Sequence, residues 1–143
     1  MAKITKSVLI NAPVEKVFEY GSDPTNQPEY WPSMIEVRDV KRLPGGGANF
    51  DWVYKMAGVR LKGSTATTEY VKNERIVTKS KGGIDSTFVY EYKPEGEGTR
   101  LTVEADYVVP VPVLGKLAEA LIIKLNEREA ETVLANLKDR LEA

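Results

Sequence analysis

Aromatic and large apolar side chains recur at every second position in several segments of the sequence. The set comprises Trp52, Tyr54, Met56, Phe88, Tyr90, Tyr92 and Tyr107. On one face of a sheet, these side chains would line a cavity for a hydrophobic small molecule, and the tyrosine hydroxyls would orient it by hydrogen bonding. The same side chains could instead fill a dry core, and the alternation alone does not separate the two.

Charged residues in the same alternating segments could supply acid–base chemistry. Those considered are Glu36, Glu69, Glu104, Asp106, Arg60 and Arg100. Any that pointed inward would be a candidate acid, base or substrate-binding group, with a pKa moved by burial. Glu69 continues the alternation of Leu61 and Thr65 and is therefore expected among the cavity-lining residues. A solvated outer face is expected for the others, and no two form a recognised pair of catalytic carboxylates.

Two residue types that dominate enzyme active sites are absent. The chain has no histidine and no cysteine, which excludes Ser–His–Asp and Cys–His catalysis, imidazole metal ligands and disulfides. A metal site would need several clustered carboxylates, and none is visible, so neither a metal nor a cofactor is expected. The glycine stretches at 44–47, 82–83 and 95–98 lack the features of phosphate-binding loops and are typical of hairpin turns.

Composition predicts one globular domain over residues 1–143. The chain carries 20 Lys and Arg against 21 Asp and Glu, so no nucleic acid or anionic membrane is expected as a partner. The N-terminus lacks the apolar core of a signal peptide, and no apolar run approaches the ~18 residues of a membrane span. A cytoplasmic protein without an integral membrane segment is therefore expected.

Alternation with a period of two predicts seven strands, six of them consecutive. They are expected at residues 3–11, 34–43, 49–57, 59–72, 75–81, 84–94 and 98–109. One polar face per strand is typical of an antiparallel sheet covered on one side. Two short helices are expected after the first strand, where Pro13 and Pro24 stand at helix-starting positions.

Residues 113–142 are predicted to form one helix of about 30 residues. Leu114, Leu117 and Leu121 lie on one side of its first half and are expected at the edge of the cavity. The apolar stripe over 121–123 is wider than one face needs. This apolar surface could line a ligand channel on one side and meet a partner subunit, in a homodimer, or a lipid surface on the other; the alternative is that it packs under residues 108–112.

Tyr30 and Trp31 stand between Pro28 and Pro32. A proline-braced loop at the mouth of a cavity would let Trp31 line or gate the opening. The alternative is that Trp31 closes the end of the sheet as part of the core.

Together these elements predict an α+β architecture. A curved seven-stranded antiparallel sheet is expected to wrap around a long C-terminal helix, with two short helices after the first strand. The long helix is the one element large enough to cover the apolar face of the sheet. Curvature of the sheet would leave room for a cavity at one end.

The order of these elements resembles the helix-grip fold of the START-like superfamily, also called SRPBCC. Local sequences carry the resemblance at 7–18 for its opening, 30–32 for its usual Trp-Pro, 96–103 for its last strand and 114–117 for its closing helix. The resemblance covers essentially the whole chain and is closest to the polyketide cyclase and dehydrase branch. It implies the fold and a common internal cavity, but no single chemistry, because members include lipid carriers, hormone receptors and cyclases.

The patterns favour a carrier or sensor of a hydrophobic small molecule, such as a lipid, an isoprenoid or quinone, or a polyketide. One alternative is an aromatase/cyclase- or dehydratase-like enzyme that uses Tyr, Glu or Arg for acid–base chemistry. The missing histidine counts against it, because no side chain titrates near neutrality without a shift. Another alternative is an accessory protein that passes a quinone or lipid to a partner.

Overall fold

Seven strands form one antiparallel sheet in the order β1-β7-β6-β5-β4-β3-β2, which places the first strand beside the last. The computed structural model describes residues 2–115 and 119–143. The strands are β1 (Ala2–Ile10), β2 (Met34–Arg42), β3 (Ala48–Met56), β4 (Val59–Val71), β5 (Arg75–Gly82), β6 (Ser86–Glu95) and β7 (Gly98–Tyr107). The predicted seven strands and their antiparallel pairing are confirmed.

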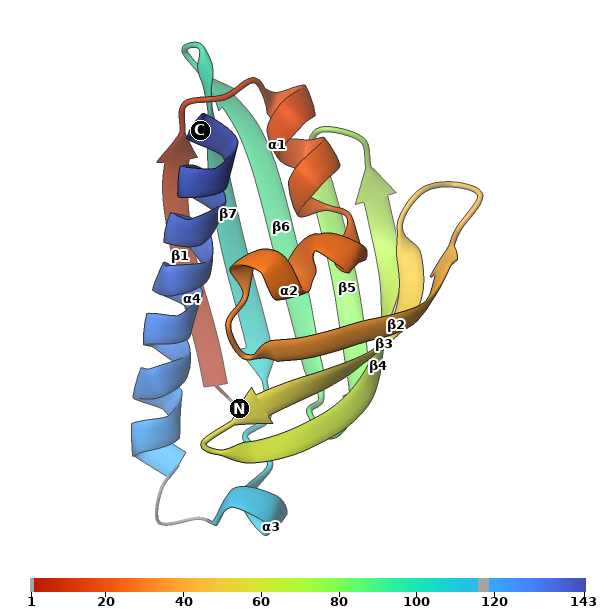
Figure 1. Ribbon diagram of the computed structural model, residues 1–143, viewed down its shortest axis with the longest axis vertical. Coiled ribbons are helices and arrows are strands. Elements are labelled where there is room, and N and C mark those ends of the chain that lie inside the picture. Colours follow the sequence, from red (N-terminus) through yellow and green to blue (C-terminus); the bar gives the residue numbers. More distant parts are fainter. Residues whose placement is uncertain (1, 116–118) are drawn as a thin grey trace.

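Three short helical segments follow β1: α1 (Val14–Gly21), η1 (Pro24–Asn26) and α2 (Gln27–Tyr30). After β7 come the short helix α3 (Val111–Leu114) and the long helix α4 (Glu119–Glu142). Asp23 begins η1 by accepting a hydrogen bond from the Thr25 backbone amide at 3.0 Å, as a helix cap does. In Figure 1 the α1 to α2 segment lies over β5 and β6, while α4 runs along β1 and β7.

The prediction of one unbroken helix over residues 113–142 is wrong. Gly115 has a φ of +92°, in the region that favours glycine, and α3 ends just before it. Pro112 stands in the first turn of α3, where a missing amide is tolerated. The described chain resumes the helix at Glu119, so α4 is shorter than predicted.

The C-terminal half of α4 holds the helix against the sheet. Val133, Leu134, Leu137 and Leu141 are buried in one cluster with the fully buried Ile10 and Leu101. Each large aliphatic side chain removed from water stabilises the fold by about 1.5–3 kcal/mol. The predicted sheet wrapped around a C-terminal helix is therefore confirmed.

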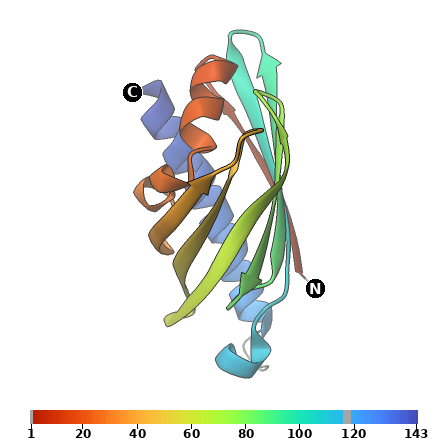
Figure 2. The same cartoon turned by 90° about the vertical axis from the view of Figure 1, so that its right-hand side faces the viewer.

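Bulges and one glycine shape the concave face of the sheet. The pairing of β4 with β5 shifts register between Thr67 and Glu69, and β2 carries two similar shifts; bulges of this kind bend a strand and increase its twist. In Figure 2, β2, β3 and β4 (orange to yellow-green) bend away from the other strands toward the side of the sheet on which the helices lie. A Cβ atom at Gly63 would collide with the Trp52 indole and the Lys81 carbonyl, so glycine lets Trp52 lie directly on the sheet.

Candidate functional site

A cavity of about 140 Å³ lies between the concave face of the sheet and the helices. Residues from all seven strands line it, together with residues of the α1 to α2 segment and Asn126 and Ala130 of α4. The interior is therefore not completely filled by the large aromatic side chains that line it.

Eight of the residues predicted to line a cavity do line it. They are Trp31, Trp52, Tyr54, Met56, Phe88, Tyr90, Tyr92 and Tyr107. The strand alternation brings the strand residues among them together, because side chains two residues apart point to the same face of a sheet. All of them except Met56 are aromatic, so aromatic rings form a large part of the cavity wall.

Glu69 does not line the cavity, and its predicted inward position is wrong. The bulge in β4 makes two residues, Thr68 and Glu69, oppose one step of β5, which reverses the facing of every residue after it. Glu69 is exposed, and its Oε2 lies 2.5 Å from the Nε of Arg75. Tyr70 takes the inward position and packs against the core.

The leucines predicted at the edge of the cavity do not line it either. Leu114 lies on α3 and packs against the core cluster that surrounds the cavity, without lining the cavity itself. Leu121 is 62% exposed, whereas its neighbour Ile122 is 2% exposed and turned toward the sheet. Leu117 lies outside the described residues.

Trp31 is fixed at the cavity wall by its neighbours. Its indole Nε1 donates a hydrogen bond to the Tyr54 hydroxyl at 3.3 Å, and its ring centroid lies 5.7 Å from that of Phe88. Trp31 is partly buried and touches both core clusters, so it lines the cavity and also closes the core. Tyr30, beside it, is buried in the core and donates a hydrogen bond to the Gly21 carbonyl at 3.4 Å.

A row of hydroxyl groups lies on the cavity wall, and all of its members except Tyr107 were missed as site residues by the sequence analysis. Thr65, Ser80, Ser86 and Tyr107 come from four adjacent strands at paired positions and all line the cavity. The Thr65 hydroxyl accepts from the Trp52 indole at 2.8 Å and lies 2.6 Å from the Ser80 hydroxyl. The signal for these residues is present in the strand alternation.

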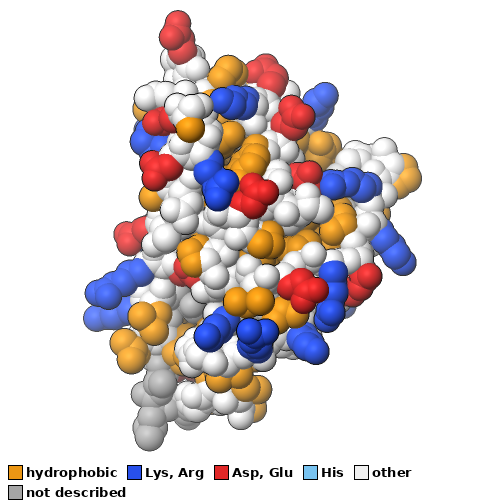
Figure 3. Space-filling model, viewed as in Figure 1, with side chains coloured by type: hydrophobic (Ala, Val, Ile, Leu, Met, Phe, Trp, Pro, Cys, Tyr) orange, Lys and Arg blue, Asp and Glu red, His pale blue; other side chains and the backbone are white. Residues whose placement is uncertain are grey.

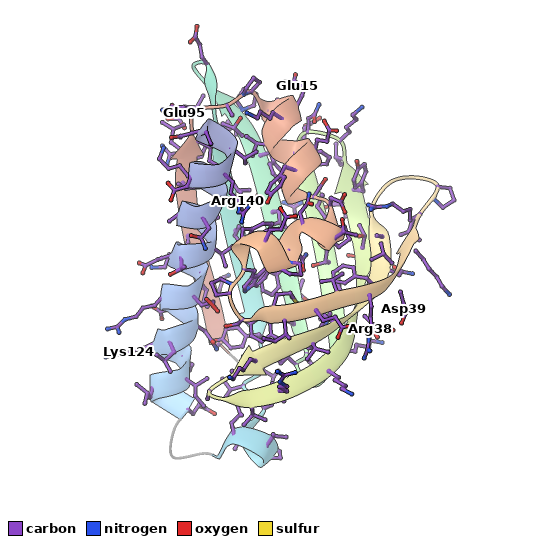
Figure 4. The ribbon with its side chains drawn as sticks, in the orientation of Figure 1. Glu15, Arg38, Asp39, Glu95, Lys124 and Arg140 are labelled. Atoms are coloured by element: carbon purple, nitrogen blue, oxygen red, sulfur yellow. The ribbon has the colours of Figure 1, made fainter. Side chains whose placement is uncertain are left out.

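No charged residue is among the described residues that line the cavity. Glu104 and Arg100, two of the strand residues considered for chemistry, form ion pairs with Lys3 and Glu95 on the outer side. Figure 4 shows Lys124 pointing away from α4, whereas Arg140 lies between α4 and α2, where its Nη1 is 3.6 Å from the Oε1 of Glu29. Glu104 and Arg100 therefore lie on the outer face of the sheet, as the sequence analysis expected for them.

Burial keeps the cavity tyrosines protonated. Desolvation raises the pKa of Tyr54 to about 12 and raises the pKa of Tyr90 and of Tyr92 further. Desolvation also raises the pKa of Tyr107. At neutral pH these phenols therefore keep their protons and do not act as bases.

Stability is expected to fall as the pH rises above 10, the ordinary pKa of tyrosine. The unfolded chain loses its phenol protons there, while folded Tyr54 keeps its proton until about pH 12. Each such group adds at most about 1.4 kcal/mol of lost stability per pH unit. Urea unfolding at increasing pH measures the slope, and Tyr54→Phe should make it shallower. An identical slope in the variant would contradict the burial of this phenol.

A second, more open hollow of about 460 Å³ shares Met56 and Asn126 with the cavity. The Asn126 amide lies 3.0 Å from the Tyr107 hydroxyl and 3.9 Å from the Met56 sulfur. The side chains of Met56 and Asn126 therefore border both hollows.

Two other kinds of functional feature are missing from the part of the chain that the structure describes. Across residues 2–115 and 119–143, no three acidic side chains are grouped so that they could hold a metal ion. No helix in the described residues combines the length and apolar character needed to cross a membrane.

Solved structures share this architecture over nearly the whole chain. The protein TTHA0849 from Thermus thermophilus is 24% identical, with a TM-score of 0.84 over 97% of this chain and 96% of the other. A START superfamily protein from Mycobacterium smegmatis is 22% identical, with a TM-score of 0.82 over 99% and 98%. The Zhui aromatase/cyclase from Streptomyces sp. R1128 is 15% identical, with a TM-score of 0.83 over 98% and 93%. At these identities the likeness establishes the fold.

The family comparison agrees with the fold. No curated protein matches the chain. The model of the family described as "Polyketide cyclase / dehydrase and lipid transport" matches residues 1–142. The predicted resemblance to the START-like superfamily, in its polyketide cyclase and dehydrase branch, is confirmed by this match and by the structural neighbours. The chain belongs to the polyketide cyclase / dehydrase and lipid transport family.

Proposed function

We propose that the protein binds a hydrophobic small molecule in the cavity and acts as its carrier or sensor. The observation that carries this proposal is the unfilled space beside Trp52, Phe88 and other apolar side chains. Moving an apolar guest from water into such a space gains about 25 cal/mol for each Å² of apolar surface buried. Family membership and fold support the same reading, since the family includes lipid transport in its description.

Intrinsic fluorescence tests this proposal without a label. The chain has two tryptophans, Trp31 and Trp52, and both line the cavity. Titration with para-cresol, para-xylene, N-phenylnaphthylamine and octanoic acid is expected to give a saturable change in tryptophan emission with at least one compound. Native mass spectrometry should show a one-to-one complex with that compound. The absence of saturable binding with all four would overturn the proposal.

A cyclase- or dehydratase-like enzyme is the second candidate. The observation in its favour is that four phenols, those of Tyr54, Tyr90, Tyr92 and Tyr107, line the cavity. The structural similarity to an aromatase/cyclase adds to it. Without a carboxylate or cation on the described cavity wall, the phenols would have to act as proton donors alone. Incubation with a linear polyketone separates the candidates: unchanged recovery supports the carrier, and ring closure or loss of water supports the enzyme.

The third candidate, an accessory protein acting through a partner or as a homodimer, stays a prediction. Val113, Leu121 and Leu125 expose apolar surface on α3 and the first turns of α4, and Figure 3 shows apolar side chains at that lower end of the molecule. Light scattering over a range of concentrations measures self-association. A mass that stays that of one chain would contradict the homodimer.

A further inference from the structure

Two phenol hydroxyls in the cavity wall have no hydrogen-bond partner among the residues that the structure describes. The cavity-lining hydroxyls of Tyr54 and Tyr107 are hydrogen-bonded to neighbouring side chains. Those of Tyr90 and Tyr92, on the inner face of β6, make no hydrogen bond to a described residue. Polar groups inside folded proteins are almost always paired, because an unmade hydrogen bond costs the full desolvation of the group. The two hydroxyls therefore need a partner that is not part of the chain.

The cavity gives such a partner access to both hydroxyls. Among the described residues, Oε1 of Gln27 is the only side-chain oxygen or nitrogen that is both unpartnered and closed off from water, so the hydroxyls of Tyr90 and Tyr92 are open to a small molecule. Tyr92 is 5% exposed and lines the cavity. Its Oη lies beside Gly21, another residue of the cavity wall, where an added Cβ atom would be 3.5 Å away. The missing partner therefore belongs inside the cavity.

Both phenols are available as hydrogen-bond donors. Desolvation raises the pKa of Tyr90 and of Tyr92, so each keeps its proton at neutral pH and has that proton to donate. A carbonyl oxygen has two lone pairs and can accept from both. A guest that carries only donors would leave both protons without a hydrogen bond. The pair therefore favours a guest that presents an acceptor oxygen.

The cavity wall also limits the charge of a guest. The described residues that line the cavity include hydroxyls, amides and indoles but no acidic or basic side chain. An ion placed there would lose its hydration without gaining a counter-charge, which is far more costly than burial of a neutral polar group. A guest of this cavity is therefore uncharged.

The volume of the cavity limits the size of a guest. An apolar cavity of about 150 Å³ engineered in another protein holds one benzene molecule, and the space here is about 140 Å³. Phe88 stacks on Tyr90 with their ring centroids 5.8 Å apart, so apolar ring surface borders the Tyr90 phenol. The expected guest is therefore about one ring in size, with an acceptor oxygen at one end and apolar surface elsewhere.

We propose that the guest is an uncharged carbonyl compound, and that the hydroxyls of Tyr90 and Tyr92 donate hydrogen bonds to its carbonyl oxygen. The two phenols then determine specificity: they favour a carbonyl compound over a hydrocarbon of the same shape. This inference rests on the proposed binding function and names the class of molecule for the same cavity.

Two ligands of nearly the same shape test the inference. Acetophenone and α-methylstyrene differ by a carbonyl oxygen in place of a methylene group, and Tyr90→Phe and Tyr92→Phe remove the hydroxyls but keep the rings. NMR titration measures both dissociation constants in the unmodified protein, in each variant and in the double variant. Because every protein is measured with both ligands, changes in ring packing cancel in the ratio. The preference for acetophenone is expected to fall by about two- to tenfold for each hydroxyl removed.

Tyr70→Phe is the matched control. Tyr70 packs against the same core cluster as Tyr90 and Tyr92 but does not line the cavity. Loss of its hydroxyl should leave the ratio of the two dissociation constants unchanged. An equal fall in Tyr70→Phe would show that the effect does not come from the cavity wall, which would overturn the inference.

The carbonyl carbon of bound acetophenone supplies a direct readout. A hydrogen bond to the oxygen withdraws electron density from this carbon and moves its NMR resonance downfield. With ligand isotopically enriched at that carbon, the resonance in the unmodified protein is expected downfield of its position in the double variant. Equal positions would mean that these hydroxyls donate no hydrogen bond to the guest. The two single variants supply the same comparison if the double variant does not fold.

The outcomes separate this inference from the binding function. If both ligands bind but their ratio does not change in the double variant, the inference is wrong and the binding function stands. If neither ligand binds the unmodified protein, a carbonyl guest of this size is wrong whatever the two phenols do, and the octanoic acid and dye titrations decide the function separately.

Discussion

Ala105→Phe is expected to weaken binding of para-cresol by about 10- to 100-fold, because the new ring takes the place of the guest. Ala105 lies two residues before the end of β7, paired with Ile4 and Phe88, and its side chain lines the cavity. Burial of a phenylalanine-sized group is worth about 1.5–3 kcal/mol, and a guest that is shut out loses a gain of that size. Tryptophan fluorescence titration measures the loss.

Thr102→Phe is the matched control. Thr102 lies on the same strand but on the opposite face, because it is three residues from Ala105. The same ring added there should leave the dissociation constant unchanged. Unfolding curves must show that both variants fold, since overpacking of a core costs about 1–3 kcal/mol. Unchanged binding in folded Ala105→Phe, or equal weakening in both variants, would contradict the assignment of the cavity.

Leu134→Ala is expected to lower the free energy of unfolding by about 2–5 kcal/mol, and Leu121→Ala by no more than about 0.5 kcal/mol. Both leucines lie on α4, but Leu134 is 3% exposed in the core cluster and Leu121 is 62% exposed. The first substitution leaves a void between the helix and the sheet, and the second removes atoms that already contact water.

Urea unfolding of the two variants measures this difference. It tests whether the C-terminal half of α4, rather than its first turns, holds the helix to the sheet. Similar losses in the two variants would contradict the packing described for α4. A large loss at Leu121 alone would indicate that its exposed face is covered by another molecule.

The strands could be predicted because a strand with one buried face carries apolar side chains at every second position. The alternation of Trp52, Tyr54 and Met56 needs no knowledge of the neighbouring strands, and it placed these residues correctly on the cavity wall. The prediction for Glu69 failed because a bulge inserts one residue without a mark in the hydrophobic pattern. One extra residue is enough to turn an expected inward carboxylate into a surface ion pair.

The helix was harder to place than the strands. Successive residues in a helix are rotated by about 100°, so an apolar run such as 121–123 does not say which of its side chains faces the core. The structure buries Ile122 and exposes Leu121.

A crystal of the protein soaked with para-bromophenol gives the decisive measurement, because bromine is located directly by its own anomalous scattering. The expected result is one strong bromine peak inside the cavity bordered by Trp52 and Phe88. Bromine found at the protein surface alone, with the cavity unchanged, would contradict the proposal that this cavity is a binding site.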